Sequence, residues 1–170
     1  MGENVSFFHS GSERGGREGL GVLSHPWDDL YRYLKGIDRR IVRIKGDGFC
    51  LLKSILLGLY IDHGIGISTD TLKKMILAHL RLHADKYADW HDSDKDGLLD
   101  DVDHFLKSAD YNQNVVDIML NIVADCLHVK IKVFTENREL IEVLQIQPQV
   151  QDSNLKTVCI LFKANRIHSL

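Results

Sequence analysis

The spacing of apolar positions changes along the chain, and the change separates helices from strands. Between residues 50 and 127 apolar side chains recur at helical spacing, which predicts helices over 50–60, 69–87, 98–108 and 115–127. From Val129 the period is two, because Val129, Ile131 and Val133 alternate with lysines, and this is typical of a half-buried strand. Further strands are predicted over 40–45, 139–146 and 156–162.

This order of elements predicts an α+β domain over residues 24–170, in which helices flank a small, mostly antiparallel sheet. Pro26 is expected to begin one more helix, which runs through Tyr33. Thr69 and Asn114 are expected to be helix N-caps. Residues 1–23 contain glycines, serines and mixed charges but no apolar core segment, so they are predicted to be a flexible tail.

Composition narrows the class of protein. A chain of 170 residues is long enough to bury one hydrophobic core. A net charge of −3 and a pI near 6.3 give no reason to expect nucleic-acid binding. No apolar run approaches the roughly 20 residues that span a bilayer, so no membrane contact is expected. Three widely spaced cysteines do not suggest a disulfide framework, which favours a reducing intracellular compartment, cytoplasmic or nuclear.

Cys50 lies where a predicted strand, a glycine loop and a helix meet. The first turn of a helix has unsatisfied N–H groups and a positive dipole end, which favour a thiolate. Gly46 and Gly48 allow backbone amides to converge on one point, as an oxyanion site requires. From these residues alone, Cys50 is either a nucleophile or a small buried apolar residue. Cys126 and Cys159 lie in core patterns and are expected to be buried and inert.

The run Gly-Asp-Gly-Phe-Cys-Leu-Leu-Lys-Ser over residues 46–54 resembles the nucleophile motif of the ovarian tumour (OTU) family of cysteine proteases. The predicted helix and strand within 111–135 and the last strand also resemble elements of that family. The resemblance implies a papain-type fold without a cofactor or a metal, active as a monomer. It implies a deubiquitinase: an isopeptidase that cuts between the C-terminal glycine of ubiquitin, or of a ubiquitin-like modifier, and lysine, with ubiquitin or polyubiquitin chains as partners.

The resemblance also implies roles for individual residues. Cys50 is the nucleophile, Asp47 organises the loop, and the loop amides around Gly48 and Phe49, with that of Cys50, hold the oxyanion. His168 follows the last strand, where the family has its base. A shift of two residues would instead put Arg166 at that position, and arginine is no base at neutral pH. We expect His168 to be the base. The segments 61–68, 109–113 and 163–166 are expected to wall the substrate slot.

Two other classes of function stay open. One is a catalytically inactive module that binds ubiquitin. A test of whether the domain hydrolyses a ubiquitin conjugate distinguishes this module from an active enzyme. Alternatively, the acidic segment 92–103 matches a calcium loop, with ligand positions Asp92, Asp94, Asp96 and Asp100 around Gly97. Asp103 replaces the bidentate glutamate of such loops, so we expect no useful calcium affinity.

The histidines on the long predicted helix and after it lack the spacing of a metal site. His79 and His83 are four residues apart, but no cysteine or acidic residue has matching spacing, and His91 stands alone. These side chains are expected to be surface or partly buried. His104 is expected to form an i,i+4 surface pair with Asp100.

Overall fold

The structure, a computed structural model, describes residues 4–9, 36, 40–44, 47–91, 94–110, 113–137, 140–150 and 152–163. The strands within these residues are β1 (Asn4–His9), β2 (Arg40–Arg43), β3 (Val129–Asn137), β4 (Leu140–Ile146) and β5 (Lys156–Lys163). The helices are α2 (Cys50–His63), α3 (Thr69–Ala88), α4 (Lys95–Ser108) and α5 (Gln113–Leu127). The α+β class predicted from the sequence is confirmed. The helix predicted over 26–33 lies outside the described residues.

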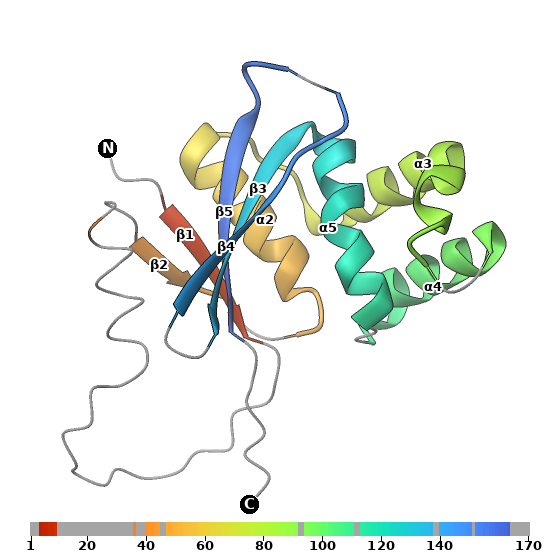
Figure 1. The fold of residues 1–170 in the computed structure, drawn as a ribbon, viewed down its shortest axis with the longest axis horizontal. Helices are drawn as coiled ribbons and strands as arrows, with labels where there is room; N and C mark the ends of the chain where they lie inside the picture. Colours follow the sequence, from red (N-terminus) through yellow and green to blue (C-terminus); the bar gives the residue numbers. More distant parts are fainter. Residues whose placement is uncertain are drawn as a thin grey trace, which may run out of the picture.

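The sheet is mixed, and the prediction of mostly antiparallel pairing is wrong. In the strand order β2-β1-β5-β3-β4, β3 and β4 form an antiparallel hairpin, whereas the three other pairings are parallel. The reason lies in the segment 147–155. Strand β4 ends beside the start of β3, where Ile146 pairs with Ile131, and this segment joins it to β5 on the other edge of β3. Strand β5 therefore begins opposite Val129 and runs in the same direction as β3 (Figure 1).

Residues 4–9 also differ from the prediction, because they form a strand instead of part of a flexible tail. Strand β1 lies between β2 and β5 and pairs with both, for example Val5 with Ile41 and with Cys159. Its sequence contains valine and two phenylalanines, residue types that favour strands. The pairing supplies hydrogen-bond partners along one edge of β5. The other residues of 1–23 lie outside the described part of the chain.

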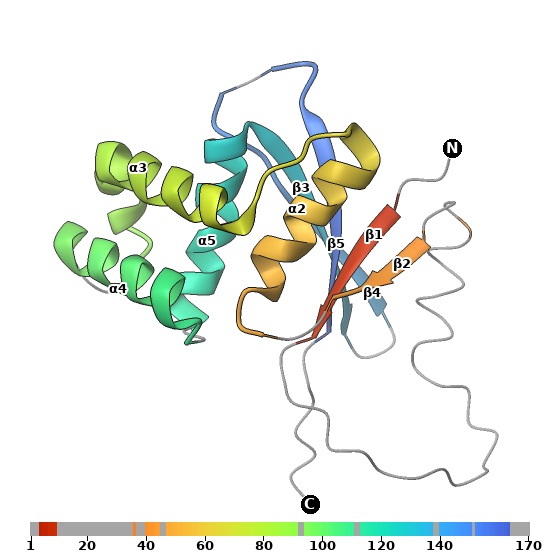
Figure 2. The same cartoon turned by 180° about the vertical axis from the view of Figure 1, so that it is seen from behind.

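The helices form two layers beside the sheet. Helices α2 and α5 pack against strands, and α3 and α4 pack on those two helices, as Figures 1 and 2 show from opposite sides. Helix α2 is apolar on almost every side because it lies between the sheet and α3. Four successive residues of β5, Val158 to Leu161, are buried, as expected for a central strand covered on both faces. No helix in the described part of the chain is long and apolar enough to cross a membrane.

Two of the helix starts have side-chain caps, and one differs from the prediction. Ser68, not Thr69, caps α3, because its hydroxyl accepts a hydrogen bond from the Thr71 amide at 3.1 Å. Asp94 caps α4 by accepting from the Gly97 amide at 2.9 Å. Helix α5 begins at Gln113, before the predicted cap Asn114. A single residue with φ of 51°, His128, joins α5 to β3.

A buried carboxylate ties α3 and α5 to the loop after β4. Asp125 on α5 accepts hydrogen bonds from the Tyr87 hydroxyl (2.5 Å), the Gln149 amide (2.8 Å) and the Lys86 ammonium (3.1 Å). Burial alone would raise the pKa of Asp125, but these three donors together lower it below its ordinary value. Burial and the same carboxylate raise the pKa of Tyr87. Asp125 is therefore ionised in the folded protein and holds three segments together.

We expect Asp125→Asn to destabilise the fold by about 2–3 kcal/mol, because buried donors lose a charged acceptor. The pKa of Asp125 is lower in the folded than in the unfolded chain. The wild type should therefore have the larger free energy of unfolding at pH values above about 4, the pKa of an aspartate in the unfolded chain. This difference should shrink as the pH falls through the pKa of Asp125 in the folded protein. Urea unfolding of both proteins at several pH values measures this difference.

Asp85→Asn is the matched control. Asp85 pairs with Lys95 at 3.0 Å, nearly the distance of Asp125 from Lys86, but its side chain is 82% exposed against 9% for Asp125. The control should change the free energy of unfolding by less than about 1 kcal/mol. Equal effects of the two substitutions would contradict the account.

Candidate active site

Cys50 is the first residue of α2 and follows the loop that leaves β2. Phe49 occupies the N-cap position without a side-chain cap, and its carbonyl accepts from the Lys53 amide at 2.9 Å. The thiol therefore lies at the amino end of a 14-residue helix, as the sequence predicts. Cys50 is 8% exposed and belongs to the main hydrophobic core.

Asp47 organises the loop in front of Cys50. One carboxylate oxygen accepts from the Phe49 amide at 3.2 Å, and the other forms an ion pair with the Lys53 ammonium. The hydrogen bond to Lys53 is the main cause that lowers the pKa of Asp47. The Phe49 amide is thus engaged by Asp47, which leaves the amides of Gly48 and Cys50 as the loop's candidate oxyanion donors.

Gly48 lies against Ala109, at the end of α4. Its φ is 79°, in the left-handed region, and a Cβ placed on it would lie 2.5 Å from both the Cβ and the carbonyl oxygen of Ala109. Ala109 is itself left-handed, with φ of 60°, and ends α4. Glycine is thus needed at position 48 for two reasons, backbone conformation and contact. The contact brings the segment after α4, one of the predicted slot walls, beside the nucleophile loop.

Phe49 fixes the same loop from its other side. Its ring makes an edge contact with Phe105 of α4, with 6.0 Å between ring centroids. The Lys73 ammonium of α3 lies 3.5 Å from the centroid of the Phe49 ring, in a cation–π contact. Three elements, α2, α3 and α4, therefore position the residue that precedes the thiol. The sequence motif identified the loop but gave no signal for Lys73, Phe105 or Ala109.

The direction of the pKa shift at Cys50 differs from the one that the helix start predicts. Burial raises the pKa of the thiol above its ordinary value, and the negative charge of Asp47 acts in the same direction. The amides of Leu51 and Cys50, at the helix start, and the charge of Lys53 lower it, but they do not offset burial. The helix terminus thus acts as predicted, yet desolvation outweighs it among the groups that the structure describes.

The remaining predictions concern the catalytic base and the two other cysteines. His168 and the rival Arg166 lie outside the described residues, so the structure does not place either against Cys50. Cys159 is fully buried, as predicted. Cys126 is only partly buried, so its prediction as a buried residue is wrong, although burial still raises the pKa of its thiol. All three cysteines lie in the described part of the chain, and no disulfide joins them.

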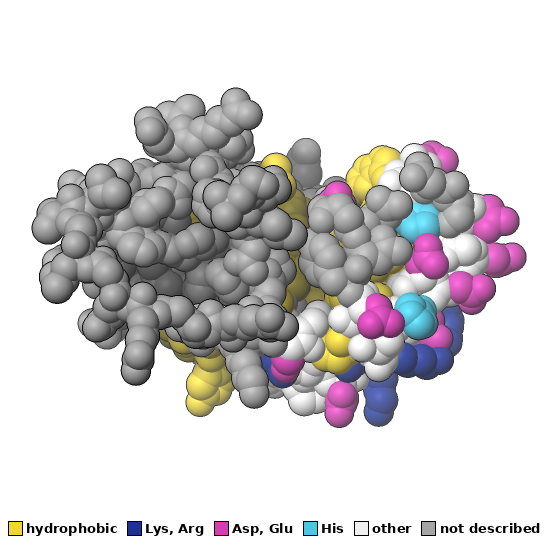
Figure 3. All heavy atoms as spheres, turned by 90° about the horizontal axis from the view of Figure 1, so that it is seen from below, with side chains coloured by type: hydrophobic (Ala, Val, Ile, Leu, Met, Phe, Trp, Pro, Cys, Tyr) yellow, Lys and Arg dark blue, Asp and Glu magenta, His cyan; other side chains and the backbone are white. Residues whose placement is uncertain are grey.

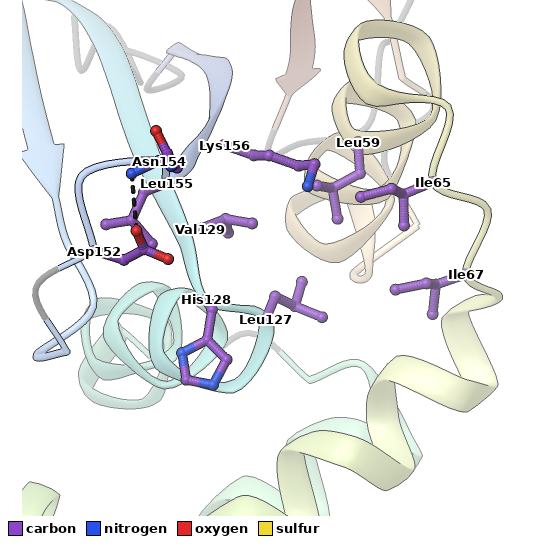
Figure 4. A pocket seen from close by; sticks show the side chains of 10 residues that line it. All are labelled: Leu59, Ile65, Ile67, Leu127, His128, Val129, Asp152, Asn154, Leu155 and Lys156. Carbon is purple, nitrogen blue, oxygen red and sulfur yellow. Dashed lines mark hydrogen bonds between the residues drawn. The ribbon is translucent and has the colours of Figure 1, made fainter.

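A cavity of about 250 Å³ lies at the opposite end of α2 from the thiol. Leu59, Ile65, Ile67 and Leu127 supply apolar side chains, and Asp152 and Asn154 lie on its polar side, where Asp152 accepts from the Asn154 amide (Figure 4). Leu59 is nine residues after Cys50, which corresponds to about 13 Å along a helix. Ile65 and Ile67 of the segment 61–68 therefore line this remote cavity, and the role of that segment as a wall of the Cys50 slot stays a prediction.

The geometry of the acidic segment contradicts the calcium-loop alternative. Residues 95–103 are helical, so Asp96 and Asp100 lie on α4, and the Asp94 side chain caps that helix. A calcium loop instead needs an irregular backbone that wraps around the ion. Asp92 lies outside the described residues. Acidic side chains gather on the side of the molecule formed by α3 and α4, as Figure 3 shows, and one of them, Asp94, caps α4.

The histidines of α3 and α4 take structural positions. His79 hydrogen-bonds the Tyr87 hydroxyl at 3.0 Å, and its ring lies 4.7 Å from that of His83. His91 pairs with Asp101 at 3.2 Å. His104 pairs with Asp110 at 3.2 Å instead of the predicted Asp100, because Asp110 directly follows the left-handed turn at Ala109. Among the described residues no group of three or more metal-ligating side chains is placed to hold an ion.

We expect Gly48→Ala to displace the loop from Ala109 and to lower the free energy of unfolding. A left-handed alanine costs about 1 kcal/mol, and relief of the clash with Ala109 should add about 1–3 kcal/mol. Gly64→Ala is the matched control, because Gly64 has φ of 67° but no atom within 4 Å of the place that a Cβ would occupy. Urea unfolding should show a larger loss of stability for Gly48→Ala than for Gly64→Ala. Equal losses in the two variants would mean that the Ala109 contact is unimportant.

Comparisons with known proteins bear directly on this site. A family model described as OTU-like cysteine protease matches residues 45–166, which is well over half of the chain and includes the loop and Cys50. No curated protein and no solved structure gave a significant match. The match begins at Lys45, just before the loop that Asp47, Gly48 and Phe49 hold in front of the thiol, and continues through β5. The chain therefore belongs to the OTU-like cysteine protease family.

Proposed function

We propose that the chain is a deubiquitinase: a thiol-dependent isopeptidase that hydrolyses the bond between the C-terminal glycine of ubiquitin, or of a ubiquitin-like modifier, and a lysine. The observation that carries the proposal is the position of Cys50 at the start of α2, behind a loop fixed by Asp47 and Gly48, within a cysteine protease family. A thiol at a helix start beside glycine amides suits acyl transfer, because attack and oxyanion stabilisation occur at one point.

The proposed reaction has two stages. The Cys50 thiolate attacks the glycine carbonyl, the amides of Gly48 and Cys50 donate to the oxyanion, and His168 protonates the lysine amine as the C–N bond breaks. In the second stage His168 removes a proton from water, which attacks the thioester and releases the modifier and the Cys50 thiol. The Phe49 amide takes no part, because it already donates its hydrogen bond to Asp47.

The raised pKa of Cys50 gives the histidine a defined task. Burial keeps the thiol protonated, and an imidazole within hydrogen-bond reach would take its proton and hold the thiolate as an ion pair. His168 is proposed for this task, since it follows β5 within a few residues. The family match includes Arg166 and ends before His168, so both positions enter the test.

A second candidate function is an inactive ubiquitin-binding module. Two observations favour it: the environment described around Cys50 disfavours the thiolate, and the shifted alignment puts Arg166 at the position of the base. In that case Cys50 would be a core residue, and the domain would bind ubiquitin without hydrolysing its conjugates.

Hydrolysis of a ubiquitin C-terminal fluorogenic amide tests the proposal. We expect the wild type to be active, Cys50→Ala to be inactive, and His168→Ala to lower kcat about a hundredfold or more, because attack and amine protonation both need the imidazole. Arg166→Ala is the control, two residues before His168, and it should at most weaken substrate binding.

The two candidate functions give opposite results in this assay. An inactive wild type that gains activity in Arg166→His would establish the degenerate domain with a lost base. Robust wild-type activity that survives His168→Ala would show that another residue is the base.

A further inference from the structure

We propose that Lys53 is a positioning residue for the nucleophile: its ammonium group neutralises Asp47 beside the Cys50 thiol and fixes the loop that presents that thiol. The inference rests on the proposed role of Cys50 as nucleophile, and it assigns a function to a side chain that neither attacks nor transfers a proton. Lys53 lies on α2, less than one turn after Cys50.

Lys53 closes the loop with both its backbone and its side chain. Its amide donates to the Phe49 carbonyl at 2.9 Å, and its ammonium forms the ion pair with Asp47. Asp47 in turn accepts from the Phe49 amide at 3.2 Å. Both polar groups of the Phe49 backbone are therefore engaged by this lysine–aspartate pair, and the residue that follows Phe49 is the nucleophile.

Charge gives the pair a second effect. An unpaired carboxylate at position 47 would oppose formation of a thiolate at Cys50, since two like charges would lie near each other. The positive charge of Lys53 acts in the opposite direction on the same thiol. The side chains of Lys53 and Asp47 are 41% and 34% exposed, so water screens the pair and the effect should be moderate.

Alkylation of Cys50 by iodoacetamide, followed across pH by mass spectrometry, measures thiolate formation without any ubiquitin substrate. Below the thiol pKa, Lys53→Met should react about threefold more slowly than the wild type, because loss of the positive charge disfavours the thiolate. Lys53→Arg should react at nearly the wild-type rate. Asp47→Asn keeps the acceptor for the Phe49 amide and should react at least as fast as the wild type.

The double variant Asp47→Asn with Lys53→Met separates charge from packing. If the lysine acts by neutralising Asp47, removal of both charges should restore nearly the wild-type rate, in a double-mutant cycle. Lys107→Met is the matched control, since Lys107 forms an i,i+4 ion pair with Asp103 on α4, and it should leave the rate unchanged. Labelling of the fully buried Cys159 reports unfolding in any variant.

Three results would overturn the proposal: a wild-type alkylation rate in Lys53→Met, an equally slow rate in Lys53→Arg, or no recovery in the double variant. These outcomes do not depend on the proposed deubiquitinase activity. A protein that never hydrolyses a ubiquitin conjugate still shows whether Lys53 controls the Cys50 thiol.

Discussion

The contact between Gly48 and Ala109 is the constraint on which the candidate site depends. It joins the loop before α2 to the end of α4, and both residues adopt left-handed backbone conformations at the point of contact. A side chain at position 48 would meet the Ala109 carbonyl, which belongs to the backbone and cannot rotate away. Phe49 packs against Phe105 of α4. Helix α4 therefore fixes the position of the loop end and of Cys50, the first residue of α2.

Holding the thiol in this way has an electrostatic consequence. The packing that fixes Cys50 also removes it from water, and burial raises the pKa of its thiol despite the helix-start amides. A fixed thiol in such a place needs a partner to become a nucleophile. In the proposed mechanism Lys53, which pairs with Asp47, gives part of the compensation, and an imidazole gives the rest.

The sequence predicts those features that depend on local patterns. Helices α2, α3, α4 and α5 and strands β3, β4 and β5 follow from periodicity, and Cys50 follows from its glycine loop. Strand β1 could not be predicted, because its pairing depends on β5, about 150 residues away in the chain. The Ala109 contact and the Lys73–Phe49 contact likewise join segments that are distant in sequence. The helix start predicts a lowered pKa for Cys50, and this prediction was wrong in direction. Burial in the packed core raises the pKa, and burial also depends on segments that are distant in the sequence.

The most direct test of the account is reaction with ubiquitin that carries a C-terminal electrophile, with the modified residue identified by mass spectrometry. The account predicts one adduct, on Cys50, which persists in Cys126→Ala and Cys159→Ala and is lost in Cys50→Ala. An adduct on Cys126 or Cys159, or no adduct on a folded wild-type protein, would contradict the assignment of Cys50 as the nucleophile of a ubiquitin-directed protease.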